Sequence, residues 1–122
     1  MKVQRISEKS LKQILDGQTK DAVSVIKFYS LGCDFCHALS EHYTAMAKEE
    51  KYADVNFFAY NIDEDNAIVD SLGLNGVPTI SLVRCRDQRA KVVTLEDPQD
   101  PHPKTWYTVN YIKNFIDKER TK

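Results

Sequence analysis

Strand-like and helix-like hydrophobic patterns alternate along this chain. Five segments rich in β-branched and aromatic residues predict strands, at 3–6, 23–30, 55–62, 79–84 and 90–95. Between and after them, apolar residues three and four positions apart predict helices, at 10–16, 34–51, 63–72 and 106–118. The order β-α-β-α-β-α-β-β-α predicts an α/β fold, in which a central mixed sheet of about five strands is flanked by about four helices.

Several local patterns refine this prediction. Both faces of the segment 23–30 are largely apolar, as in a strand covered on two sides. The first helix is expected to begin at a capping box, Ser10-Leu11-Lys12-Gln13, and to end at Gly17. In the second helix, one side is expected to face inward: Ala38, Leu39, His42, Tyr43, Met46 and Ala47. The last helix is expected to start at Trp106, after a proline-rich loop at 97–104. Trp106 is expected to be a packing residue, and the alternative is an exposed ring that binds a partner.

Length and composition indicate one globular domain spanning 1–122, and we expect a monomer. The net charge of -1 gives no support for binding nucleic acid or an anionic membrane surface. No apolar stretch approaches the length of a bilayer span. The first residues, Met1 to Arg5, are followed by a polar segment instead of the apolar core of a secretion signal, so we expect a cytoplasmic location.

Two motifs carry candidate chemistry. Cys33-Asp34-Phe35-Cys36 lies where a strand-like segment gives way to a helix-like one, and a C-x-x-C in this setting is typical of redox proteins. Gly76-Val77-Pro78-Thr79 leads into another apolar segment. Together with Asn61-Ile62-Asp63, these segments resemble the thioredoxin superfamily over most of the chain. The resemblance implies the thioredoxin fold, a cis Pro78, and a Val77 whose backbone binds an extended substrate.

The chain also departs from the usual thioredoxin pattern. Gly32-Cys33-Asp34-Phe35-Cys36 stands where the superfamily commonly has Trp-Cys-Gly-Pro-Cys. Lys27 replaces a buried carboxylate on the central strand, and Glu41 replaces a proline that often bends the active-site helix. These differences leave the fold prediction intact, but they put the redox potential and the choice of substrate in doubt.

The resemblance assigns Cys33 as the nucleophile and Cys36 as the resolving thiol of a redox-active disulfide. A helix N-terminus favours an anion, so the pKa of Cys33 is expected to fall below that of a free thiol. Asp34 opposes this effect because a neighbouring carboxylate repels a thiolate. Phe35 is expected either to present an apolar contact to a partner or to fold over the neighbouring surface. Cys85, placed in a hairpin turn, is expected to be a free structural thiol, and the alternative is a regulatory or intermolecular thiol.

Lys27 has two interpretations. If it is buried near Cys36, its pKa should fall, and it could exchange protons with that thiol or stabilise its thiolate. The other interpretation, which we favour from sequence, is a buried stem that carries the ammonium group to solvent.

Other site chemistries remain as alternatives. Cys33 to His37 also matches the c-type haem attachment pattern. His37 is otherwise expected to be a solvated helix residue. The two cysteines with His37 or His42 would supply half of a zinc site, but no second pair of ligands stands at a suitable spacing. We therefore expect neither a metal nor another cofactor.

The sequence favours a thiol–disulfide oxidoreductase that reduces protein disulfides through Cys33 and Cys36. Asp34, Phe35, Val77 and Pro78 are its candidate substrate-binding residues. Its expected partners are disulfide-containing proteins and an external thiol reductant or reductase. The alternative is a binding module on the same fold, in which the surface of Phe35 and Val77 docks a partner and the cysteines are regulatory or incidental.

Overall fold

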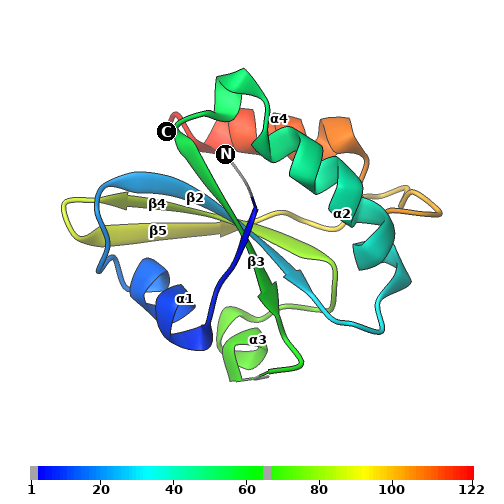
Figure 1. The fold of residues 1–122 in the computed structure, drawn as a ribbon, viewed down its shortest axis with the longest axis horizontal. Helices are drawn as coiled ribbons and strands as arrows, with labels where there is room; N and C mark the ends of the chain where they lie inside the picture. Colours follow the sequence, from blue (N-terminus) through cyan, green and yellow to red (C-terminus); the bar gives the residue numbers. More distant parts are fainter. Residues whose placement is uncertain (1–2, 65–66) are drawn as a thin grey trace.

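The computed structural model describes residues 3–64 and 67–122, and a five-stranded mixed sheet forms its centre (Figure 1). The strands lie in the order β1-β3-β2-β4-β5. Their bounds are Gln4–Arg5 for β1, Ala22–Tyr29 for β2, Val55–Asn61 for β3, Thr79–Arg86 for β4 and Arg89–Thr94 for β5. β1, β2 and β3 are parallel, whereas β4 runs antiparallel to both β2 and β5. The predicted fold class is confirmed.

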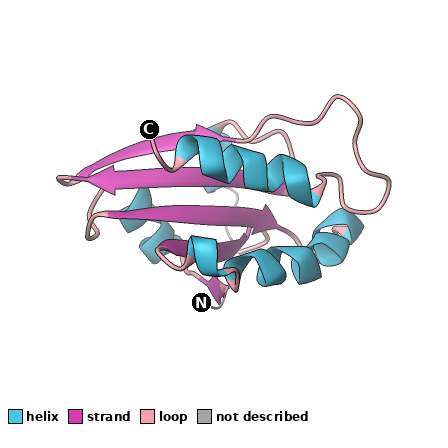
Figure 2. Ribbon diagram, turned by 90° about the horizontal axis from the view of Figure 1, so that it is seen from above, coloured by secondary structure: helices cyan, strands magenta, loops and turns pink. Residues whose placement is uncertain are grey.

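Four α-helices cover the two faces of the sheet, and a short 3₁₀ helix, η1 (Glu50–Tyr52), precedes β3. α2 (Asp34–Ala47) and α4 (Val109–Glu119) lie on one face, and α1 (Glu8–Leu15) and α3 (Ala67–Leu72) lie on the other (Figures 1 and 2). The central strand β2 contributes side chains to the core on both faces of the sheet. Val25 packs under α2 and α4, while Ile26 and Phe28 pack under α1 and α3. This two-sided burial explains its continuous apolar sequence.

α1 begins earlier than the sequence suggested. Its N-cap is Ser7, whose hydroxyl accepts a hydrogen bond from the backbone N–H of Ser10 (3.1 Å), so the capping box at Ser10 is wrong. The prediction of the helix end is confirmed, since Gly17 follows the C-cap with a positive φ of 74°. A Cβ at Gly17 would lie only 2.6 Å from the carbonyl oxygen of Gln88. Glycine is therefore needed here both for its backbone conformation and for close approach of the hairpin.

The β4–β5 hairpin turns later than predicted. β4 continues through Cys85, and the turn consists of Asp87 and Gln88, both with positive φ. The side chain of Asp21 stabilises the turn by accepting a hydrogen bond from the backbone N–H of Asp87 (2.9 Å). Cys85 is consequently a buried strand residue, and its earlier placement in a turn is wrong.

The boundaries of α2 and α4 also differ from the predictions. α2 ends at Ala47, and Ala38 and His42 on it are exposed, so the expected inward side is narrower than predicted. α4 begins at Val109 after the N-cap Thr108, and Trp106 lies in the preceding loop instead of on the helix. Part of the predicted helix at 63–72 falls on residues 65–66, which lie outside the described residues.

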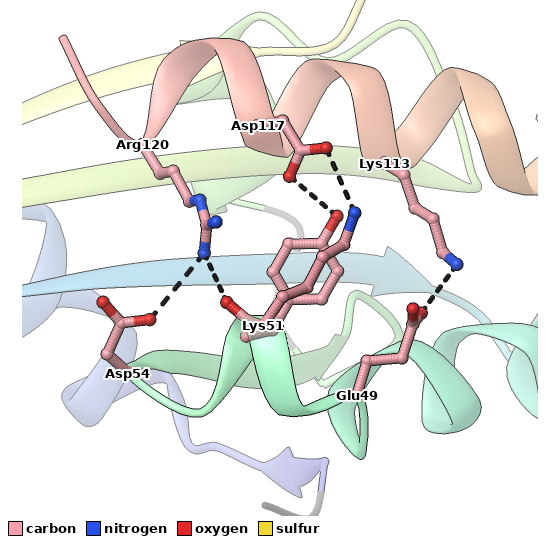
Figure 3. A network of polar contacts seen from close by, with 7 residues as sticks. Glu49, Lys51, Asp54, Lys113, Asp117 and Arg120 are labelled. Carbon is pink, nitrogen blue, oxygen red and sulfur yellow. Dashed lines mark hydrogen bonds and ion pairs between the residues drawn. The ribbon is translucent and has the colours of Figure 1, made fainter.

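A network of polar contacts joins α4 to η1 (Figure 3). Asp117 accepts a hydrogen bond from the hydroxyl of Tyr52 (2.9 Å) and pairs with Lys51 (3.3 Å). Arg120 donates to the carbonyl of Lys51 (2.7 Å), and Lys113 pairs with Glu49 (2.7 Å). Single exposed ion pairs contribute little to stability, but together these contacts fix the C-terminal helix against the segment that leads into β3.

Candidate active site

Cys33 and Cys36 form a disulfide at the start of α2, with their Cα atoms 5.2 Å apart. Cys33 is the N-cap of the helix, and its Sγ accepts a hydrogen bond from the backbone N–H of Cys36 (3.0 Å). Cys33 is half-buried, whereas Cys36 is only 2% exposed. Cys33 is thus the more accessible of the two cysteines, and it lies where the unpaired N–H groups of a helix end favour an anion.

The turn before Cys33 is fixed by side chains from elsewhere in the chain. The backbone N–H of Leu31 donates to Oδ2 of Asp63 (3.0 Å), just beyond the end of β3. Nε2 of His37 lies 2.7 Å from the carbonyl oxygen of Leu31. These contacts hold the end of β2 and the first turn of α2 in a fixed relation. The sequence places Asp63 at the strand end before the third helix, and its hydrogen bond to Leu31 depends on spatial proximity that the sequence does not show.

A groove that includes Phe35, which lies between the two cysteines in the sequence, brings together three of the candidate substrate-binding residues. Phe35, Val77 and Pro78 line a cavity of about 280 Å³ together with Trp106. The Val77–Pro78 peptide bond is cis. Asp34 does not line this cavity, and it lies exposed in the first turn of α2.

The indole of Trp106 forms one wall of this groove. Its ring meets the ring of Phe35 edge to face, with centroids 5.5 Å apart. Nε1 of Trp106 donates to Oδ1 of Asp97 (3.2 Å), and backbone hydrogen bonds pair Trp106 with His102. Trp106 has a positive φ of 66°, which is uncommon for a bulky residue. The long loop before α4 thus lies next to the first turn of α2. Phe35 packs on this loop, which is the second of its two expected arrangements, a ring folded over the neighbouring surface.

Lys27 lies beneath the start of α2 and is only 5% exposed. Its Nζ is 5.3 Å from the ring centroid of Tyr43 and 5.6 Å from that of Tyr29, within the range of cation–π attraction. Burial, together with the positive charge of Arg5, lowers the pKa of Lys27 to about 8. The ammonium group therefore does not reach open solvent as we favoured from sequence. Instead it faces a cavity that Cys36 also lines.

The third cysteine lies away from this site. Cys85 is buried, and its thiol donates weakly to the carbonyl oxygens of Thr19 (3.5 Å) and Gly17 (3.6 Å). Within residues 3–64 and 67–122, no three His, Cys, Asp or Glu side chains gather as ligands for a metal ion. In the same described part of the chain, no helix has the length and apolar character needed to cross a membrane.

The fold and the disulfide together define the class. A five-stranded mixed sheet with a C-x-x-C disulfide at the N-terminus of the helix after its central strand is the architecture of the thioredoxin superfamily. Residues 2–100 match the family described as Thioredoxin, and the chain belongs to that family. Among curated proteins, no sequence is significantly similar to this chain.

Solved structures with the same fold include several thioredoxins. Chloroplastic thioredoxin z has 18% identity and a TM-score of 0.71, with 100% of this chain and 97% of that chain covered. Thioredoxin f from spinach chloroplast has 21% identity and a TM-score of 0.71, covering 98% and 94%. A thioredoxin from Nicotiana alata has 21% identity and a TM-score of 0.70, covering 96% and 91%. At these identities the likeness concerns the fold.

Proposed function

We propose that this protein is a thiol–disulfide oxidoreductase that reduces disulfides of partner proteins. The observation that carries the proposal is the asymmetry of the Cys33–Cys36 pair, with one sulfur accessible at a helix N-terminus and the other buried behind it. Disulfide exchange requires an accessible thiolate and a second thiol within reach. The partial exposure of Cys33 and the position of Cys36 directly behind it support both conditions.

In the proposed reaction, the Cys33 thiolate attacks one sulfur of the partner's disulfide. A mixed disulfide forms between Cys33 and that sulfur, and the partner's other sulfur leaves as a thiolate that takes up a proton. Cys36, after losing its proton, then attacks the Cys33 sulfur and displaces the second partner thiolate. The partner gains two electrons and two protons, and the Cys33–Cys36 pair is oxidised. An external thiol reductant or reductase returns the pair to the dithiol.

Lys27 is proposed to assist the second step by stabilising the thiolate of Cys36, since both residues line one cavity. At neutral pH the ammonium is charged, because its pKa of about 8 lies above the ambient pH. A positive charge near a thiol favours its ionised form. The exposed carboxylate of Asp34 acts in the opposite direction on Cys33, so the two cysteines experience charges of opposite sign.

The groove of Phe35, Val77, Pro78 and Trp106 is proposed to bind the partner segment that contains the disulfide. The backbone of Val77 would pair with an extended segment, while the two aromatic rings contact its side chains. Backbone pairing alone accepts many sequences. Contact with the ring of Trp106 would add a preference for particular side chains of the partner.

The proposed function is tested by trapping the intermediate with Cys36→Ser. Without the resolving thiol, the mixed disulfide at Cys33 cannot be released, so a covalent adduct with insulin chains should accumulate. We expect mass spectrometry to detect the adduct and dithiothreitol to remove it. The wild type should catalyse insulin reduction by dithiothreitol, and Cys85→Ser, a control that leaves the disulfide intact, should do the same.

The binding-module alternative predicts a different outcome. If the wild type does not accelerate insulin reduction and Cys36→Ser gives no adduct, the cysteines do not carry out exchange and the oxidoreductase proposal fails. A partner would then have to be sought for the Phe35 and Val77 surface alone.

Trp106→Ala tests the proposed groove. Loss of the indole should raise KM for insulin roughly threefold to tenfold, because an aromatic contact contributes about 0.5–1.5 kcal/mol and 1.4 kcal/mol corresponds to about tenfold. The rate with a small disulfide that does not fill the groove should change little. Trp106→Phe, which keeps an aromatic ring but loses the hydrogen bond to Asp97, is the matched control. Equal KM values for wild type and Trp106→Ala would exclude this role.

A further inference from the structure

A row of residues across the sheet leaves a gap between two cations. The register of β1, β3 and β2 aligns Arg5 with Ala59 and Ala59 with Lys27. Residues aligned in this way project from the same face of a sheet, and alternate strands are about 10 Å apart. The methyl group of Ala59 is too small to fill the space between the longer side chains. An opening therefore remains beneath α2, with one cation on either side.

This opening is a cavity of about 250 Å³. α2 covers it with Cys36, Ser40 and Thr44, which lie four residues apart on one side of the helix. No carboxylate is found among the described residues that line the cavity. Its polar side chains are thus the cations Arg5 and Lys27, the imidazole of His37, and four hydroxyl residues, namely Ser40, Thr44, Tyr29 and Tyr43.

Among the residues that the structure describes, the ammonium group of Lys27 has no anionic partner. No hydrogen bond or ion pair connects its Nζ to any residue in the described ranges 3–64 and 67–122, where its recorded contacts are with two tyrosine rings and its nearest charged neighbour is the cation Arg5. Buried charges are normally paired, because an unpaired one loses its hydration without compensation. Cation–π attraction offsets only part of that loss. The site therefore lacks one negative charge.

We propose that this cavity binds a small oxyanion, either a carboxylate or a phosphate group, with Lys27 as its central ligand. Arg5 contributes the second positive charge, and the hydroxyls of Ser40 and Thr44 provide further donors. The volume limits the ligand to a molecule smaller than the usual drug-sized one. The site does not depend on thiol exchange, because Lys27 and Arg5 are in place while the cysteines are joined as a disulfide.

Oxyanion binding at this site should depend on pH. The groups that face Lys27 are Arg5 on β1, Tyr29 on β2, and Cys36, His37 and Tyr43 on α2. In the disulfide form Cys36 does not titrate. Since burial and Arg5 lower the pKa of Lys27 to about 8, the ammonium loses its charge as the pH rises above that value. Binding should weaken at least several-fold between pH 7.5 and pH 9.5 in the wild type.

The test measures anion binding to the oxidised protein by NMR titration in amine buffers that contain no oxyanion. Inorganic phosphate and acetate are the two probes, with chloride at matched ionic strength as the reference. We expect saturable shifts centred on Lys27, Ala59 and Ser40, and the tighter of the two probes identifies the group bound. Lys27→Met should weaken binding at least tenfold and abolish the pH dependence, Lys27→Arg should restore most of the affinity, and Arg5→Gln should weaken it several-fold.

A matched control comes from the opposite edge of the sheet. Lys91 belongs to an open surface lined by basic side chains, namely Arg84, Arg86, Arg89, Lys91 and Lys122. Lys91→Met removes one positive charge there and should leave binding beneath α2 unchanged. The proposal is overturned if Lys27→Met binds like the wild type, if phosphate and acetate cause no more than the chloride effect, or if the shifts map to the Lys91 surface. If Lys27→Met does not fold, Arg5→Gln and the pH dependence of the wild type decide the question.

Discussion

Cys33→Ser should reduce the rate of insulin reduction roughly a thousandfold or more, the scale expected when a covalent nucleophile is lost. The structure places Cys33 at the N-cap of α2, where a thiolate would be stabilised and reachable. A serine hydroxyl is not ionised at neutral pH and does not attack a disulfide. Cys36 cannot replace Cys33, because it is 2% exposed and lies behind it.

The measurement compares turnover of the wild type, Cys33→Ser and Cys36→Ser with dithiothreitol as reductant. Cys33→Ser should form no adduct with insulin, in contrast to the adduct expected for Cys36→Ser. Circular dichroism should show that both variants keep the native fold. Activity of Cys33→Ser near that of the wild type would mean that another thiol attacks first, and our assignment of the nucleophile would be wrong.

The parts of this structure that sequence predicts well are those fixed by local pattern. Residue type and spacing predict the continuous apolar strand β2 and the presence of a hairpin after Pro78. The C-x-x-C could be placed at a helix start because strand and helix patterns meet there. The fold class was predictable from the sequence because the order of strand and helix patterns is also a local feature.

Long-range contacts explain what the sequence did not show. Trp106 looked like a helix residue, yet its backbone pairs with His102 and its ring packs on Phe35, and both contacts depend on the path of the intervening loop. Arg5 gave no functional signal, because its position opposite Lys27 follows from strand register across β3. The burial of Lys27 was underestimated because a lysine on a strand usually reaches solvent, and here α2 closes over it.

Lys27→Met should stabilise the folded protein by about 2–3 kcal/mol at pH 7. Burial and Arg5 lower the pKa of Lys27 from 10.5 to about 8, so the charged form is disfavoured in the folded state. Each unit of pKa shift corresponds to about 1.4 kcal/mol, which sets an upper limit between about 3 and 4 kcal/mol. Methionine fills a similar volume without a charge, and the lost cation–π contacts offset part of the gain.

The sign of the pH dependence follows from the direction of the shift. Below about pH 8 the lysine is protonated in both states, and the wild type bears the full cost of burying the charge. Between pH 8 and 10.5 the unfolded chain binds more protons than the folded one, so the stability of the wild type rises relative to that of the variant. The difference should shrink to under about 1 kcal/mol by pH 10.

Urea unfolding of the oxidised proteins at pH 7 and pH 10 measures this difference, in amine buffers so that no oxyanion occupies the cavity. Lys91→Met, at an exposed position on β5, should change stability by less than about 0.5 kcal/mol at both pH values. A destabilised Lys27→Met at pH 7 would show that the ammonium has a partner that compensates its burial. In a separate measurement, adding the oxyanion that binds more tightly should stabilise the wild type but not Lys27→Met. A ligand that binds only the folded state raises the stability of that state.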